Sequence, residues 1–259
     1  MSKLPVQPTV VIDFETSGPL IANMKSHGQG DSILGYGITA GYMDPNTRMP
    51  VISHRLSVGI KCAQAVPTTT GEWLSLWKLN QWQWSGEDST FDFWSGRVAQ
   101  SEHGKLTGHL PALVRLWQDT EAGDGFHGTH HVVQSLGVAA DMLHEFLGQV
   151  ERASPTGGYV WVTDCIAFDP ALAFALLTQN GKLPMTHLRN GQYRWHGTYD
   201  EDSVLINAEL GVDASQEEKN AQLKQSALAL LPMPNHEHHP QVDAACILLR
   251  FLLATQGPK

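Results

Sequence analysis

The stretch that decides the fold is Val10-Val11-Ile12-Asp13-Phe14-Glu15-Thr16-Ser17-Gly18. Its three β-branched apolar residues predict a strand in the buried centre of a sheet. Because side chains alternate along a strand, Asp13 and Glu15 point to the same side. Two neighbouring carboxylates at the end of such a strand repel each other and lose hydration. A divalent cation relieves both costs, since hard cations prefer carboxylate oxygens, and the stretch therefore suggests a cation site.

Context, and not the number of acidic pairs, supports this interpretation. The chain has 26 acidic residues, and pairs separated by one residue occur about as often as chance gives. The other two such pairs, Asp119/Glu121 and Asp200/Asp202, lie in polar stretches and are interpreted as solvated loop charges. Only Asp13/Glu15 directly follows an apolar β-branched run.

Composition restricts the class of protein. A chain of 259 residues with 42% hydrophobic content is expected to fold as one domain over 1–259, with a sizeable core. A net charge of −9 argues against a general electrostatic clamp for duplex nucleic acid. Three widely spaced cysteines, Cys62, Cys165 and Cys246, give no disulfide framework and no zinc pattern. With no signal-peptide pattern and no long apolar run, we expect a cytoplasmic protein without a membrane partner.

Hydrophobic periodicity predicts an α/β chain. The predicted strands cover 10–18, 32–42, 51–60 and 159–162, and the predicted helices cover 132–150, 171–177, 217–230 and 242–253. The turn Asp44-Pro45-Asn46 joins the second and third strands into a hairpin. We therefore expect a mixed sheet in which three antiparallel N-terminal strands are extended by parallel strands and flanked by helices.

Residues 65–128 are predicted to form a Trp-rich insertion, which holds six of the eight tryptophans. Trp73 and Trp77 are one helical turn apart, so they can share one face of a helix. Such a face can stack on unpaired bases, but packing against the core is the favoured interpretation, since aromatic residues at helical spacing usually pack.

Two further acidic positions stand at predicted helix starts. Asp169 precedes Pro170 and is suited to capping a helix, at the end of the sheet where α/β folds bind ligands. Pro240 marks the start of the last helix, which places Asp243 in its first turn. His238 lies just before this start and can reach the space in front of the Asp243 carboxylate.

These motifs, taken in order, resemble the DEDDh group of 3′–5′ exonucleases, the DnaQ-like branch of the RNase H-like fold. They are hydrophobic-Asp13-Phe-Glu15-Thr16, Phe-Asp169 at a mid-chain helix, and His238-x-x-x-x-Asp243 at a C-terminal helix. The stretch Trp161-Val-Thr-Asp-Cys-Ile-Ala-Phe-Asp169 lacks the common His-Asn pair and is closer to a phage and bacterial exoribonuclease-like subgroup. Ser89-Thr90-Phe91-Asp92-Phe93-Trp94 is similar to another stretch of that subgroup.

The resemblance implies a site and a reaction. Asp13, Glu15, Asp169 and Asp243 would hold two divalent cations, Mg²⁺ or Mn²⁺, and His238 would be the general base. Thr16 matches the residue whose backbone meets the terminal nucleotide. Pro240 replaces a usual small residue, which leaves open whether His238 or His239 faces the site. The implied activity is hydrolysis of single-stranded nucleic acid, RNA or DNA, from a free 3′ end.

Two other classes of function are open. The first is a catalytically degenerate nucleic-acid-binding module on the same fold. The second is a zinc protein that uses a histidine-rich set. That set comprises His127, His130, His131, His236, His238 and His239. The sequence indicates neither the oligomeric state nor the processivity of the proposed enzyme.

Overall fold

The computed structural model describes residues 3–16, 33–61, 129–163, 169–182, 199–200, 215–233 and 239–255. Their elements, in chain order, are β1 (Thr9–Thr16), β2 (Ile33–Met43), β3 (Pro50–Ile60), β4 (His130–Val133), α6 (Leu136–Ala153), β5 (Val160–Thr163), α7 (Asp169–Gln179), β6 (Tyr199–Asp200), α10 (Ser215–Ala229) and α11 (Pro240–Ala254). The predicted Trp-rich insertion at 65–128 lies outside these residues, as does the second subgroup-like stretch at 89–94.

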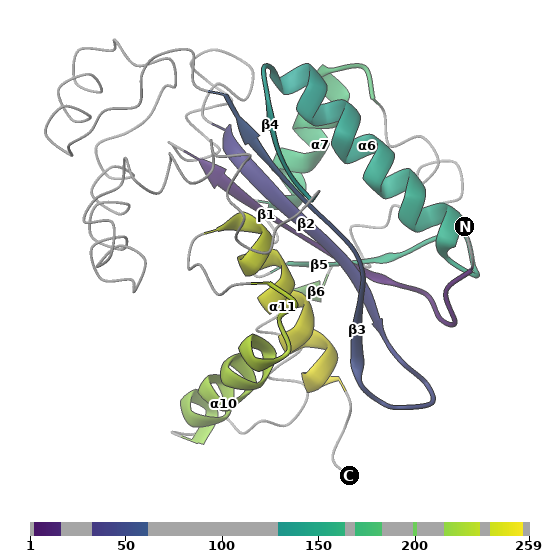
Figure 1. Ribbon diagram of the computed structural model, residues 1–259, viewed down its shortest axis with the longest axis vertical. Coiled ribbons are helices and arrows are strands. Elements are labelled where there is room, and N and C mark those ends of the chain that lie inside the picture. Colours follow the sequence, from purple (N-terminus) through teal and green to yellow (C-terminus); the bar gives the residue numbers. More distant parts are fainter. Residues whose placement is uncertain are drawn as a thin grey trace, which may run out of the picture.

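The strands form one mixed sheet with the order β4-β3-β2-β1-β5-β6. β1, β2 and β3 pair antiparallel, β5 runs parallel to β1, and β6 runs parallel to β5. Figure 1 shows α6 and α7 on one side of this sheet and α10 and α11 on the other. The predicted α/β class, with three antiparallel strands extended by parallel strands and flanked by helices, is confirmed.

Alternation along β1 divides the core between the two faces of the sheet. Val10, Ile12 and Phe14 are buried in the cluster that includes residues of α6 and α7. Val11 is buried in the cluster formed with α11. Because Asp13 and Glu15 have the same parity as Val11, they belong to the α11 face.

Glycines of β2 allow α11 to lie close against the sheet. A Cβ atom at Gly37 would collide with the backbone of Pro240, and one at Gly41 would collide with the carbonyl of Val51 on β3 and crowd Leu248 on α11. A side chain at Gly37 would push the helix away, whereas one at Gly41 would mainly disturb the pairing of β2 with β3. The small residues of β2 therefore set how near the first turn of α11 comes to β1.

The helices on the opposite face are fixed by local signals. Ser135 caps α6, where its Oγ accepts a hydrogen bond from the backbone N–H of Val138 at 3.4 Å. α7 ends in a Schellman motif, since the N–H of Lys182 donates to the carbonyl of Leu177 and Gly181 has a φ of 69°.

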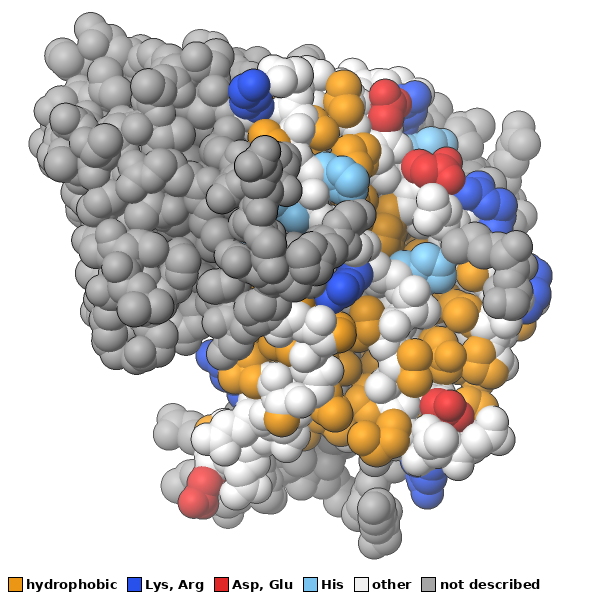
Figure 2. All heavy atoms as spheres, viewed as in Figure 1, with side chains coloured by type: hydrophobic (Ala, Val, Ile, Leu, Met, Phe, Trp, Pro, Cys, Tyr) orange, Lys and Arg blue, Asp and Glu red, His pale blue; other side chains and the backbone are white. Residues whose placement is uncertain are grey.

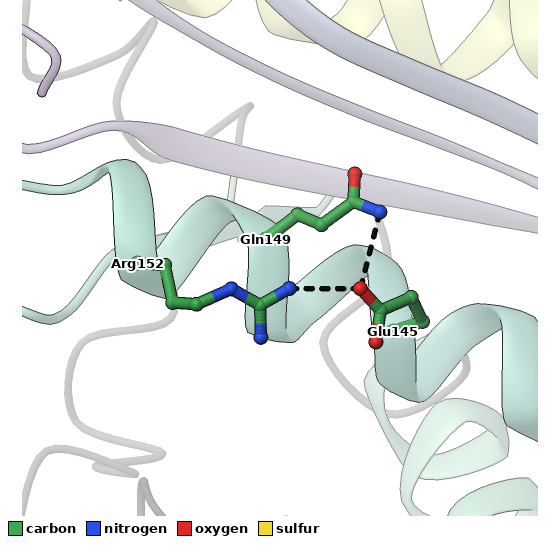
Figure 3. A network of polar contacts seen from close by, with 3 residues as sticks. All are labelled: Glu145, Gln149 and Arg152. Atoms are coloured by element: carbon green, nitrogen blue, oxygen red, sulfur yellow. Dashed lines mark hydrogen bonds and ion pairs between the residues drawn. The ribbon is translucent and has the colours of Figure 1, made fainter. Parts of the chain in front are cut away.

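The solvent side of α6 carries a polar network. Figure 3 shows Gln149 and Arg152 both donating to Oε1 of Glu145, at 3.2 and 2.8 Å. These two hydrogen bonds, that of Gln149 first, lower the pKa of Glu145. Because the carboxylate of Glu145 is exposed, these interactions add little to the stability of the fold.

One sequence prediction about element bounds is wrong. The helix expected from Val132 begins at Leu136, because Ser135 caps it and residues 130–133 instead form β4 parallel to β3. Asp200 lies in the two-residue β6 beside Thr163, which agrees with the short extended pieces that the sequence predicts within the polar segment 192–208. Across the described residues, no helix has the length and apolar character that a membrane span requires.

Candidate metal centre

The carboxylates of Asp13 and Glu15 extend from the same face of β1. Their cross-strand neighbours on β2 are Gly37 and Gly35. Since neither glycine has a side chain, β2 places nothing beside the two carboxylates on this face. Glu15 is only 5% exposed, and Asp13 is half-buried.

The first turn of α11 brings a third carboxylate to the pair. The helix starts at Pro240, as the sequence predicts, and Asp243 lies in its first turn. One carboxylate oxygen each from Asp13, Glu15 and Asp243 all lie within 4.8 Å of one another. Three oxygen ligands this close together form a donor set suited to a hard divalent cation.

Asp169 joins the same end of β1 through hydrogen bonds. Its Oδ1 accepts the backbone N–H of Phe14 at 3.0 Å, and its Oδ2 accepts the Thr163 hydroxyl at 3.5 Å. The ladder between β1 and β5 ends at Val11 and Val162, so the carboxylate continues the pairing of β1 where β5 no longer does. Asp169 is 3% exposed and is the first residue of α7.

The electrostatics of the cluster are unfavourable without a counter-charge. Burial first, then the charges of Asp243 and Asp169, raise the pKa of Glu15 well above its ordinary value. A buried carboxylate next to like charges resists ionisation. A bound cation would reverse this effect, because it stabilises the ionised form of each ligand.

The histidine that the sequence favours as the base, His238, lies outside the described residues, whereas its neighbour His239 is described. His239 is 1% exposed and caps α11, with its Nδ1 accepting the backbone N–H of Gln241 at 3.3 Å. Its ring also packs edge-on against His130 at a centroid distance of 5.2 Å. These contacts give His239 a structural role at the start of α11, and the role of His238 as the general base stays a prediction.

Thr16, the predicted substrate contact, ends β1. A register shift between Glu15 and Thr16 interrupts the pairing with β2 there, and such irregularities often occur beside functional sites. Thr16 is buried, and its role toward a substrate stays a prediction.

Figure 2 shows few acidic side chains on the face that carries α10 and α11, and they form no continuous patch among the described residues.

A separate pocket of about 460 Å³ includes Ser53, His54 and Phe146 in its lining. Ser53 Oγ lies 3.0 Å from Nδ1 of His54, and burial lowers the pKa of that histidine. Among the described residues, no carboxylate lines this pocket, so the described lining supplies no acidic group to orient the base as in a catalytic triad.

Sequence reasoning missed the polar residues that hold the first turn of α11, which include Thr129 and Gln241. Gln241 is completely buried, and both polar atoms of its side chain bond to Thr129. A glutamine one residue after a helix-starting proline carries no special signal in a single sequence. Only the three-dimensional fold brings these two positions together.

A scan against protein-family models finds no family that matches this chain, and a search of curated proteins finds no match either.

Proposed function

We propose that the chain is a metal-dependent 3′–5′ exonuclease that hydrolyses phosphodiester bonds from the 3′ end of single-stranded nucleic acid. One observation carries the proposal. Asp13 and Glu15 near one end of the chain meet Asp243 near the other, with ligand atoms within 4.8 Å. Asp169, the remaining acid of the resemblance, bonds to the backbone between the first two.

The sheet supports the proposal as well. The antiparallel β1–β2–β3 unit, extended beside β1 by parallel strands, is compatible with an RNase H-like fold. In α/β folds, ligands bind at the carboxyl ends of the parallel strands. β1 and β5 run parallel, and Glu15 and Asp169 lie at or just beyond the carboxyl ends of these strands.

The chemistry assigns a task to each residue. Asp13, Glu15 and Asp243 would hold one divalent cation, and Asp169 would contribute to a second. Cations in such a pair stabilise the charge that develops on the attacking and leaving oxygens of phosphoryl transfer. His238 would take the proton from the attacking water, since a histidine exchanges protons near neutral pH. Thr16, through its backbone, would position the terminal nucleotide.

The test is release of nucleotides from labelled single-stranded oligonucleotides of RNA and of DNA, blocked at either the 3′ or the 5′ end. We expect hydrolysis with Mg²⁺ or Mn²⁺ but none with a chelator, and only when the 3′ end is free. Asp13→Ala and Asp243→Ala should each lower the rate by orders of magnitude. A matched control is Asp141→Ala, which removes an exposed carboxylate paired with Lys182 on the surface.

Two results would contradict the assignment. Full activity of either Asp13→Ala or Asp243→Ala would show that the acidic cluster does not perform hydrolysis. Oligonucleotide binding by the wild-type protein without any release of nucleotides would instead favour the degenerate binding module.

A further inference from the structure

The first turn of α11 is held by a buried polar pair. The Gln241 side chain is 0% exposed. Its Nε2 donates to the carbonyl of Thr129 at 3.4 Å, and its Oε1 accepts the Thr129 hydroxyl at 3.2 Å. A buried amide is costly unless it is hydrogen-bonded. The reciprocal bonds therefore fix the distance between the helix and the residue that precedes β4.

The same turn is tied to the sheet through histidine. His239 accepts the backbone N–H of Gln241, and its ring packs on His130. His130 Nδ1 in turn lies 2.7 Å from the Ser57 hydroxyl, and the Ser57 N–H donates to the carbonyl of Thr129 at 2.7 Å. The network thus connects α11 to both β3 and β4.

This turn carries Asp243, one of the three proposed cation ligands. The backbone N–H of Asp243 donates to the carbonyl of His239 at 3.1 Å, so a shift of His239 moves Asp243 as well. On the other side, Pro240 touches β2 at Gly37. The turn is therefore held between β2 on one side and Thr129 on the other, and Asp243 takes its position from both contacts.

We propose that Thr129 and Gln241 form a positioning pair for the cation site. Their hydrogen bonds hold the first turn of α11 where Asp243 meets Asp13 and Glu15. This inference rests on the proposed cation site and adds to it the residues that determine its affinity. Groups that orient metal ligands typically change metal affinity by about 10–100-fold when they are removed.

The experiment measures Mn²⁺ binding by the full chain, from the electron paramagnetic resonance signal of the free ion, well below the melting temperature of each variant. Thr129→Val keeps the shape of the side chain and removes its hydroxyl, and Thr129→Ser restores the hydroxyl. Gln241→Met keeps the length of the side chain and removes both hydrogen bonds. The matched control is Thr255→Val, which removes a hydroxyl hydrogen bond to Leu252 at the opposite end of α11.

We expect Thr129→Val and Gln241→Met each to weaken Mn²⁺ binding about tenfold. Thr129→Ser and Thr255→Val should bind as the wild type does. The double variant of Thr129→Val and Gln241→Met should be no weaker than Gln241→Met alone, because the two side chains act through one contact. If Gln241→Met does not fold, the difference in Mn²⁺ affinity between Thr129→Val and Thr129→Ser tests the positioning pair on its own.

Each contrary result has a distinct meaning. Wild-type affinity in Thr129→Val overturns the positioning pair and leaves the cation site standing. Equal loss in Thr129→Ser and Thr129→Val also overturns it, since the hydroxyl then has no part in the effect. If the wild-type protein binds no Mn²⁺, the result contradicts the proposed cation site and therefore the positioning pair as well.

Discussion

Replacing Glu15 by glutamine should stabilise the metal-free protein while it weakens cation binding. Glu15 is buried, and its ligand oxygen lies within 4.8 Å of those of Asp13 and Asp243. Two unit charges at this separation repel by about 3 kcal/mol at an effective dielectric constant of about 20. Glutamine has nearly the same volume and no charge. We therefore expect Glu15→Gln to raise the free energy of unfolding near neutral pH by about 1–3 kcal/mol.

The gain should depend on pH in a defined direction. Burial and the neighbouring carboxylates raise the pKa of Glu15 in the folded protein above its ordinary value of 4.5. Below that value, Glu15 is protonated in both the folded and the unfolded states, so its ionisation does not lower the free energy of unfolding. As the pH rises further, only the unfolded state loses its proton, so the wild-type free energy of unfolding falls by about 1.4 kcal/mol per pH unit until the folded pKa is reached.

The assay is urea unfolding in the presence of a chelator from about pH 5 to about pH 8. The difference in unfolding free energy between Glu15→Gln and the wild type should be small at the acid end and should grow with pH. Adding Mg²⁺ in place of the chelator should stabilise the wild type much more than the variant, because a ligand stabilises the state that binds it. Glu218→Gln, an exposed substitution on α10, should show neither effect.

A wild-type protein whose stability does not fall relative to Glu15→Gln across this pH range would refute the reasoning. It would mean that Glu15 ionises in the fold without penalty, and that the cluster does not need a cation to balance its charge. Equal stabilisation of both proteins by Mg²⁺ would place the cation elsewhere.

Two further substitutions test the geometry of the site. Gly37→Ala should force the start of α11 away from the sheet, because the new methyl group would collide with Pro240, and it should cost about 1–3 kcal/mol in urea unfolding as well as weaken Mn²⁺ binding. Gly137→Ala, which meets only ordinary contacts in α6, is the control and should be neutral or stabilising. Asp169→Asn keeps an acceptor for the Phe14 N–H; calorimetry should show that one Mn²⁺ still binds while the second is lost, and loss of both would contradict the division of ligands.

The elements that the sequence predicts well are those with a strong local pattern. β1 stands out because Val10, Val11 and Ile12 run directly into its carboxylates, and α11 because Pro240 precedes a helical period. The first turn of α11, and so the place of Asp243 on it, follows from the same proline. These features need no knowledge of distant contacts.

The parts that the sequence does not predict depend on contacts between distant segments. β4 has four residues and exists because it pairs with Ser57–Ile60 at the edge of the sheet, which no local period reveals. The partner of Asp169 is a backbone N–H on β1, and the local sequence, which indicates a helix cap at the end of the sheet, does not reveal this contact. The role of Thr129 likewise depends on a glutamine far along the chain.

The order of the chain has a consequence for synthesis on the ribosome. α11 follows every strand of the sheet, and it covers Val11 on β1. Ribosomes add about 5–20 residues per second, so a nascent chain can pair β1, β2 and β3 for about 10–40 s with this apolar face bare, before α11 is made. During that interval the face is a target for chaperones and for aggregation. When α11 packs on the sheet, it covers this face and brings Asp243 to the acidic cluster in the same step. A nascent chain that still lacks α11 therefore has neither a covered core nor a complete acidic cluster.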